Sequence, residues 1–136
     1  MQFVPKNHYI KKLESNEVFV FGSNTAGKHG AGAARMAMQL FGARYSEGIG
    51  RTGQCYAIPT KDAAIEPLTV KQIKPYVVEF LKYAREHPEL QFLLTDIGCG
   101  LAGNDPSDIA PLFRKHPPNV ILPEAFYELL YDDRTI

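Results

Sequence analysis

Two glycine-rich segments contain the residues of this chain best suited to bind a phosphate group: residues 22–32 and 98–103. Each follows an apolar run typical of a buried strand and precedes a predicted helix. Glycine lets a ligand approach the backbone N–H groups closely, and the free N–H groups at a helix N-terminus attract anions. The pair therefore predicts a phosphate-bearing ligand, and two neighbouring loops could hold a diphosphate between them. The alternative is that the glycines only make tight turns.

The first segment nearly matches a nucleotide-binding P-loop. Residues Gly22 to Lys28 fit the spacing GxxxxGK, but His29 stands where a Ser or Thr would bind magnesium. Gly30 and Gly32 then fall in the first turns of the expected helix, where each glycine costs about 1 kcal/mol relative to alanine. A P-loop-like nucleotide phosphatase is therefore a minor alternative.

The second segment matches the GxGxxG fingerprint of dinucleotide-binding proteins. In that fingerprint the helix opens at the glycines, whereas the helix expected here begins at Pro106, three residues after Gly103. A dinucleotide-dependent oxidoreductase is therefore a second minor alternative.

The elements predicted around these segments alternate between strands and helices. We expect strands over residues 18–21, 55–58, 91–97 and 119–122, and helices over residues 33–41, 69–87, from Pro106 onward, and 124–130. This alternation indicates an α/β sheet with mostly parallel strands. In such sheets, ligands bind beyond the carboxyl ends of the strands, which is where both glycine segments lie.

Two of the expected helices carry signals about their ends and faces. Thr69 and Gln72 have the spacing of a capping box, while Pro75 either kinks that helix or marks its true start. In the helix over residues 33–41, the side chains expected to face the core are Met36, Leu40 and Phe41.

Composition narrows the class of protein. The 136 residues fit one domain, residues 1–136, and fifteen basic residues balance fifteen acidic ones. Binding to nucleic acid through bulk charge is thereby excluded, and no direct sequence-specific binding to nucleic acid is expected. With no apolar run of about 18 residues and no signal peptide, we expect a cytoplasmic protein without a membrane partner. Two cysteines and four histidines without metal-ligand spacing predict neither a metal nor a cofactor.

Taken together, the two glycine segments resemble the binding loops of macrodomains, which are α/β/α modules that bind ADP-ribose and in some members hydrolyse ADP-ribosyl bonds. Residues 21–34 are similar to the first binding loop, and residues 97–103 are similar to the diphosphate loop. The resemblance covers about residues 18–122 and implies a three-layer α/β/α fold with a mixed, mostly parallel sheet. It implies ADP-ribose, a related diphosphate nucleoside or an ADP-ribosylated macromolecule as partner. The ligand-binding residues that it implies are Gly22, Ser23, Asn24, Thr25, Gly30, Ala31, Gly32, Ala33, Ile97, Gly98, Cys99, Gly100, Leu101, Ala102 and Gly103.

Within that family, the chain is most similar to the ADP-ribosyl-glutamate hydrolases and to small bacterial and phage macro-like proteins. That subgroup uses a lysine at the end of the strand between the loops, and the stretch over residues 59–62 resembles it. The resemblance implies that Lys61 is the nucleophile in hydrolysis of a glycosidic or ester bond. A solvated lysine at a strand end is the alternative. The acid–base partner is Asp105, Asp62 or Asp96, and Asp105 is otherwise a helix cap.

The chain departs from the family at two positions. Ala102 stands where the subgroup has an Asp, which favours binding without turnover and leaves Asp105 as the candidate substitute. Residues Asn7 to Ile10 include no acid where macrodomains tend to have an Asp that contacts adenine. A binding module that does not turn over its ligand is therefore the main alternative to a hydrolase.

The remaining candidates have weaker signals. Arg51 and Thr52 lie between two glycines and are candidate phosphate contacts, although a solvated turn explains them equally well. Cys99 is expected to shape its loop rather than act as a nucleophile. His29 is the histidine with a possible role at the site. Candidates for stacking on adenine, each of which could instead belong to the core, are Tyr45, Tyr56 and Phe126.

Overall fold

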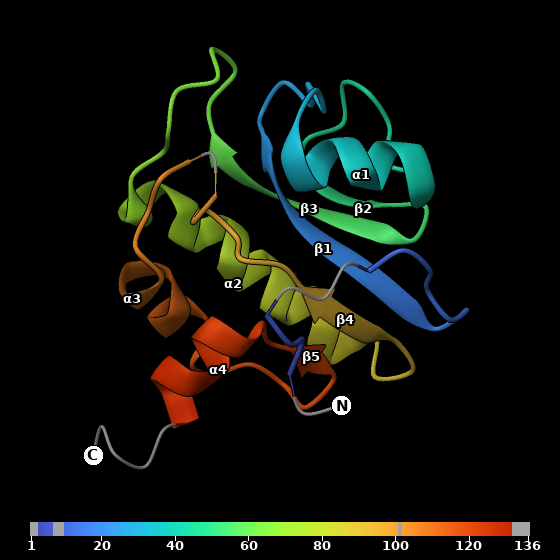
Figure 1. Cartoon of the computed structure of the whole chain (residues 1–136), viewed down its shortest axis with the longest axis vertical. Coiled ribbons are helices and arrows are strands. Elements are labelled where there is room, and N and C mark those ends of the chain that lie inside the picture. The colour runs from blue at the N-terminus through green and yellow to red at the C-terminus, as the bar shows by residue number, and fades with distance from the viewer. Residues whose placement is uncertain (1–2, 7–9, 101, 132–136) are drawn as a thin grey trace.

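Five strands form one sheet in this computed structural model, which describes residues 3–6, 10–100 and 102–131 (Figure 1). The strands are β1 (Glu17–Asn24), β2 (Gly50–Thr52), β3 (Cys55–Lys61), β4 (Gln91–Leu94) and β5 (Val120–Ile121), and their order in the sheet is β2-β3-β1-β4-β5. Strands β3, β1, β4 and β5 are parallel to one another, and β2 pairs with β3 in the antiparallel sense. The predicted α/β class and the mixed, mostly parallel sheet are confirmed.

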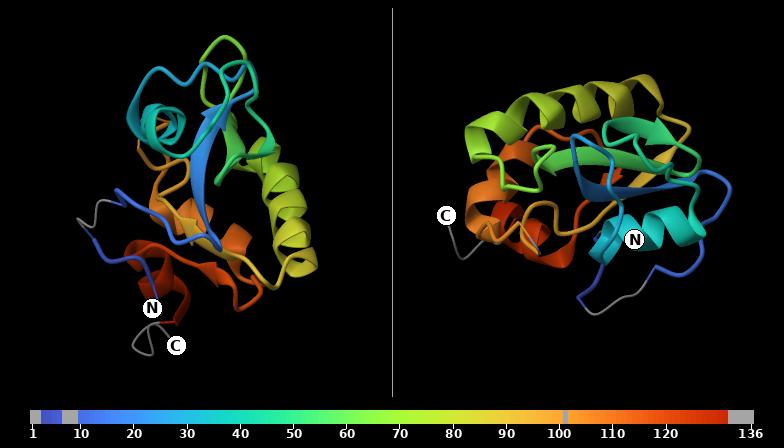
Figure 2. Two further views of the ribbon diagram at one scale, coloured as in Figure 1. Left: turned by 90° about the vertical axis from the view of Figure 1, so that its right-hand side faces the viewer. Right: turned by 90° about the horizontal axis from the view of Figure 1, so that it is seen from above.

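Helices lie on both faces of this sheet (Figure 2). They are α1 (Gly32–Leu40), α2 (Val70–Glu86), α3 (Pro106–Ile109), which continues as the 3₁₀ turn η1 (Ala110–Phe113), and α4 (Glu124–Tyr131). Buried residues of α1 pack with Phe19 and Phe21 of β1, whereas those of α2, η1 and α4 pack with Val18 and Val20. Because successive residues of a strand point to opposite faces, β1 is buried on both sides, which explains its continuous apolar run.

The longest helix begins where its capping signal lies. The Thr69 hydroxyl accepts a hydrogen bond from the Gln72 backbone N–H at 3.2 Å, and the Gln72 side chain accepts one from the Thr69 N–H at 2.9 Å. This reciprocal pair confirms the predicted capping box. Pro75 lies inside α2, so it does not mark the start of the helix.

Several local predictions were wrong. β1 and β3 each continue three residues beyond the expected end, to Asn24 and Lys61, because the two strands remain paired there. Residues 50–52 form strand β2, although only a loop was expected there. This three-residue segment is a strand because its backbone pairs with β3. Leu40 is 54% exposed rather than in the core, since the buried face of α1 runs through Ala34, Ala37 and Phe41. β4 ends at Leu94, three residues earlier than expected. No helix in the described parts of the chain is long and apolar enough to cross a membrane.

Candidate functional site

A cavity of about 760 Å³ opens at the carboxyl ends of β1, β3 and β4. Because these three strands are parallel neighbours, their carboxyl ends meet at the same edge of the sheet, where open α/β sheets bind ligands. Both glycine segments contribute to the cavity wall. The sequence-predicted residues that line it are Gly22, Ser23, Asn24, Gly30, Ala31, Gly32, Ala33, Lys61, Ile97, Gly98, Cys99, Gly100 and Ala102.

Other predicted site residues lie elsewhere. Thr25, Gly103 and Asp105 flank the cavity in sequence but are not among the residues that line it. Arg51 lies on β2, where its guanidinium donates to the Gly53 carbonyl at 2.9 Å and to the Tyr83 hydroxyl at 3.1 Å. Neither Arg51 nor Thr52 lines the cavity, so the structure does not bring them to the two glycine segments. Leu101, Asn7, His8 and Tyr9 lie outside the described residues.

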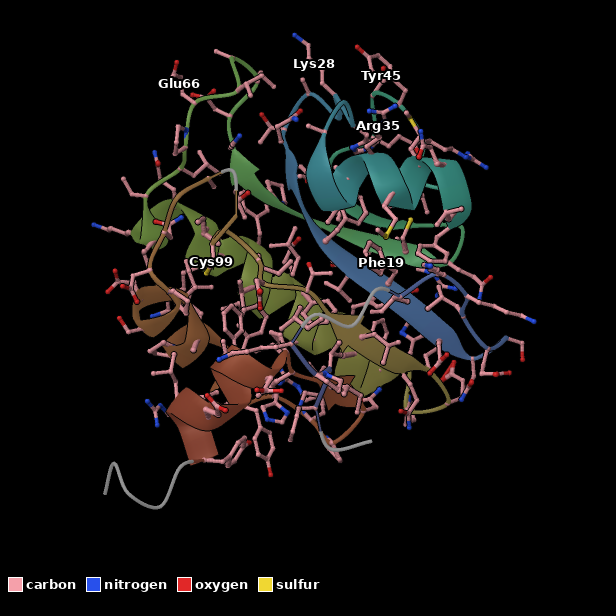
Figure 3. All side chains as sticks on the ribbon, in the orientation of Figure 1. Phe19, Lys28, Arg35, Tyr45, Glu66 and Cys99 are labelled. Atoms are coloured by element: carbon pink, nitrogen blue, oxygen red, sulfur yellow. The ribbon has the colours of Figure 1, made fainter. Side chains whose placement is uncertain are left out.

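The aromatic candidates for stacking do not line the cavity. Tyr56 and Phe126 are buried in the core on the α2 face of the sheet, where they belong to one apolar cluster. Tyr45 is 63% exposed, and Figure 3 shows it above α1, at the same end of the molecule as Lys28. The core interpretation therefore holds for Tyr56 and Phe126.

Asn24 shapes the first glycine loop with its side chain. Its Oδ1 accepts a hydrogen bond from the Lys28 backbone N–H, and its Nδ2 donates one to the Lys28 carbonyl, each at 2.9 Å. Gly27 within this loop has a φ of +70°, and an added Cβ there would lie 2.3 Å from the Glu47 backbone nitrogen. Only glycine fits at position 27. Asn24 closes the loop, which places Lys28 at the cavity wall.

His29 is buried beneath the first loop and does not line the cavity. Its ring is fully buried, and its edge meets Phe21 with the ring centroids 5.5 Å apart. Nε2 lies 2.9 Å from the Arg44 carbonyl and 3.1 Å from the Glu47 carbonyl, whereas the buried Nδ1 has no hydrogen-bond partner among the described residues. This arrangement fixes residues 44–47 against the first loop, so His29 has a structural role.

The N-terminus of α1 faces the cavity without a side-chain cap. Its N-cap residue is Ala31, which has no oxygen to accept a hydrogen bond, and the first turn contains no acidic residue. Gly32, Ala33 and Ala34 of that turn line the cavity. The first N–H groups of a helix have no partner inside the helix and carry a partial positive charge, so this end can bind an anion.

The second glycine loop is closed by Asn104, a residue that sequence reasoning missed. Both its backbone N–H and its Nδ2 donate to the Gly98 carbonyl at 2.9 Å, and Gly103 N–H donates to the Gly100 carbonyl at 3.0 Å. A Cβ added at Gly100 would meet no atom within 4 Å, and the same holds for Gly30 in the first loop. Both glycines therefore face open space, which leaves their backbone accessible to a ligand.

The charged side chains of the cavity are Lys28, Lys61 and Asp96. Partial desolvation raises the pKa of the Asp96 carboxyl, and the nearby Lys6 opposes this shift. Lys61 is half-buried at the last position of β3, next to the loop that follows this strand. Figure 3 shows Lys28 and Glu66 at one end of the molecule, with Cys99 nearer its middle.

The two other candidate acids are engaged outside the cavity. Asp105 caps α3: its carboxylate accepts from the Ser107 N–H and hydroxyl at 2.8 Å each, and these bonds lower its pKa. Asp62 accepts from the Ala64 and Glu66 N–H groups at 2.9 and 3.0 Å. Of the three acids considered as acid–base partners, Asp96 is the one that lines the cavity.

Cys99 is not suited to act as a nucleophile. Desolvation raises the pKa of its thiol to about 12, and the carboxylates of Asp96, Asp105 and Asp108 add to the shift. The thiolate is the reactive form of cysteine, and at neutral pH this side chain remains a thiol. The expectation that Cys99 does not act as a nucleophile agrees with this environment.

No protein-family model, curated protein or solved structure matches this chain. Any function must therefore follow from the cavity and its residues.

Proposed function

We propose that this protein binds ADP-ribose, or a closely related diphosphate nucleoside, in the cavity between its two glycine loops, as the resemblance to macrodomains implies. One observation carries the proposal: the uncapped N-terminus of α1 and the second glycine loop line the same cavity. Free N–H groups on one wall and exposed glycine backbone on another suit an anion with several phosphate oxygens.

The size and charge of the cavity also support this ligand. Its volume of about 760 Å³ lies within the range of roughly 300–1,000 Å³ that is typical of sites for small molecules and cofactors. Lys28 and Lys61 supply positive charge to set against a diphosphate, while Asp96 is the single acid among the residues described as lining the cavity.

Calorimetric titration with ADP-ribose tests this proposal, with AMP, ADP and NAD as parallel ligands. We expect micromolar binding of ADP-ribose, about −8 kcal/mol, and weaker binding of AMP. Gly100→Glu places a carboxylate in the cavity without a clash in the protein, so it should abolish binding and leave the fold intact. The matched control is Val78→Glu, because Val78 is 53% exposed on α2 and does not line the cavity. Unchanged affinity of Gly100→Glu would contradict the proposed site.

Hydrolysis of an ADP-ribosyl bond is the second candidate function, favoured by the presence of Lys61 and Asp96 in one cavity. The Lys61 amine would attack the anomeric carbon and displace the linked group, which takes a proton from the Asp96 carboxyl. Water would then displace the lysine amine from the anomeric carbon, and the proton that this water gives up would return to the Asp96 carboxylate. The raised pKa of Asp96 suits a proton donor, whereas Ala102 favours binding without turnover.

Turnover assays separate the two functions. For a hydrolase we expect Lys61→Ala to remove turnover of an ADP-ribosylated peptide while ADP-ribose still binds. Lys61→Arg is the matched control, because it keeps the positive charge but lacks a nucleophilic amine. If wild-type protein binds ADP-ribose but releases none from modified proteins or nucleic acids, the protein is a binding module.

A further inference from the structure

The loop between β3 and α2 presents an isoleucine to the cavity in an unfavourable backbone conformation. Ile65 lines the cavity and is 40% exposed. Its φ is +65°, in the left-handed region that β-branched residues almost never adopt. Glycine or asparagine would occupy this position at a lower cost in free energy.

No apolar packing among the described residues favours an isoleucine at this position. Its side chain belongs to neither of the two buried apolar clusters. An exposed apolar side chain on a left-handed residue opposes stability in two ways, through its strained backbone and through its contact with water. Strain of this kind persists where the surrounding structure enforces it, and it is concentrated at ligand-binding positions.

The surrounding loop does enforce the conformation. The Asp62 carboxylate binds the N–H groups of Ala64 and Glu66, the residues on either side of Ile65. The Ile65 N–H donates to the Asp62 carbonyl at 3.0 Å, and the Asp62 N–H donates to the Glu66 carbonyl at 2.8 Å. Lys61 and Pro67, the residues that flank this loop, form an antiparallel bridge. Loop residues 62–66 therefore form a closed turn in which Ile65 is the one large apolar side chain.

We propose that Ile65 is a specificity-determining contact that packs its side chain against the sugar or base ring of the bound nucleotide. The inference rests on the proposed function and adds an apolar wall to a site otherwise described by phosphate-binding backbone and charged groups. Ile65 and Lys61 both line the cavity, and the Lys61–Pro67 bridge holds the turn that carries Ile65 beside the end of β3. Ribose and adenine rings both offer apolar faces to such a side chain, whereas inorganic phosphate and pyrophosphate do not.

The decisive variant is Ile65→Asn, which suits the left-handed conformation but removes the apolar contact. We expect its melting temperature to equal or exceed that of the wild type, while its affinity for ADP-ribose falls about fivefold, the effect of exposing part of one apolar side chain. Its affinity for pyrophosphate should not change. Ile65→Val keeps an apolar β-branched side chain and should bind within about twofold of the wild type.

A matched control exists at Ser46, which has a φ of +76°, is exposed and does not line the cavity. Ser46→Gly should also relieve strain but leave the affinity for ADP-ribose unchanged. If wild-type protein binds ADP-ribose and Ile65→Asn binds it equally well, the role of Ile65 is refuted and the proposed function stands. A lower melting temperature for Ile65→Asn would show a structural role and also overturn the inference. If the wild type binds none of the four nucleotides, the proposed function fails, and the role of Ile65 fails with it.

Discussion

Asn24 encloses the backbone of Lys28 with both ends of its side-chain amide, since Lys28 N–H donates to Oδ1 and Nδ2 donates to the Lys28 carbonyl at 2.9 Å each. The resemblance to macrodomains implies that Asn24 is a ligand-binding residue. In the structure its side chain instead makes the first glycine loop a closed unit and holds Lys28 at the wall of the cavity. Asn24 therefore influences ligand binding by fixing the shape of the first loop.

Replacing Asn24 tests this role. Asn24→Ala removes two hydrogen bonds at a buried position, so we expect the free energy of unfolding to fall by about 1–3 kcal/mol. Affinity for ADP-ribose should fall with it, because the loop can then open. Asn24→Asp keeps the acceptor for the Lys28 N–H and should lose less stability. Urea denaturation and calorimetry measure the two effects, and equal stability of Asn24→Ala and wild type would contradict the role.

Affinity for an anionic ligand should increase as the pH falls below neutrality. The pKa of Asp96 is raised by desolvation, so this carboxylate takes up a proton at a higher pH than an ordinary carboxyl group. Protonation removes a negative charge from the cavity and with it the repulsion of a diphosphate. We expect affinity to rise about two- to fivefold as the pH approaches the raised pKa. Titrations at several pH values measure it, and Asp96→Asn, which cannot ionise, should remove the dependence.

The closed turn over residues 62–66 should depend on one acceptor. Asp62→Ala removes the oxygen that binds the N–H groups of Ala64 and Glu66, so the turn loosens and Ile65 loses its fixed position. We expect a loss of about 1 kcal/mol in stability and a loss of affinity similar to that of Ile65→Asn. Asp62→Asn retains a side-chain oxygen acceptor and should restore most of both. If Asp62→Asn does not restore stability and affinity, then the charge of Asp62, rather than its hydrogen bonds, is responsible for both.

Stability should decline at alkaline pH. Desolvation raises the pKa of Cys99 and that of Tyr56 to about 12, and nearby carboxylates add to both shifts. In the unfolded chain a thiol ionises near pH 8.5 and a phenol near pH 10. Between these values and pH 12 the unfolded state loses protons that the folded state keeps, so a higher pH favours unfolding. At pH 9.5 we expect the unfolding equilibrium constant to rise about three- to tenfold through Cys99.

Urea denaturation between pH 7.5 and 10.5 checks this dependence. Cys99→Ala removes one of the groups responsible, so its decline in stability should begin at a higher pH and be less steep. Cys55, whose pKa is also raised by burial, remains in that variant and contributes the rest of the early decline. Identical curves for Cys99→Ala and wild type would show that Cys99 ionises normally in the folded protein.

Patterns within single segments predicted much of the framework. The continuous apolar run of β1, the capping box of α2 and the helix that Asp105 caps before Pro106 all depend on neighbouring residues. The meeting of the two glycine segments at one cavity also followed from sequence, because parallel strands place their carboxyl ends at one edge of the sheet.

Contacts between distant segments decided the rest. Arg51 is taken away from the cavity by the pairing of β2 with β3 and by Tyr83 of α2, which no local pattern indicates. Asn24 and Asn104 close their loops through backbone groups whose positions exist only once the chain has turned. The left-handed conformation of Ile65 opposes its own residue preference and is imposed by Asp62. Residue type and spacing determine local preferences, whereas the positions of side chains in a cavity are set by the combined contacts of all the segments that form it.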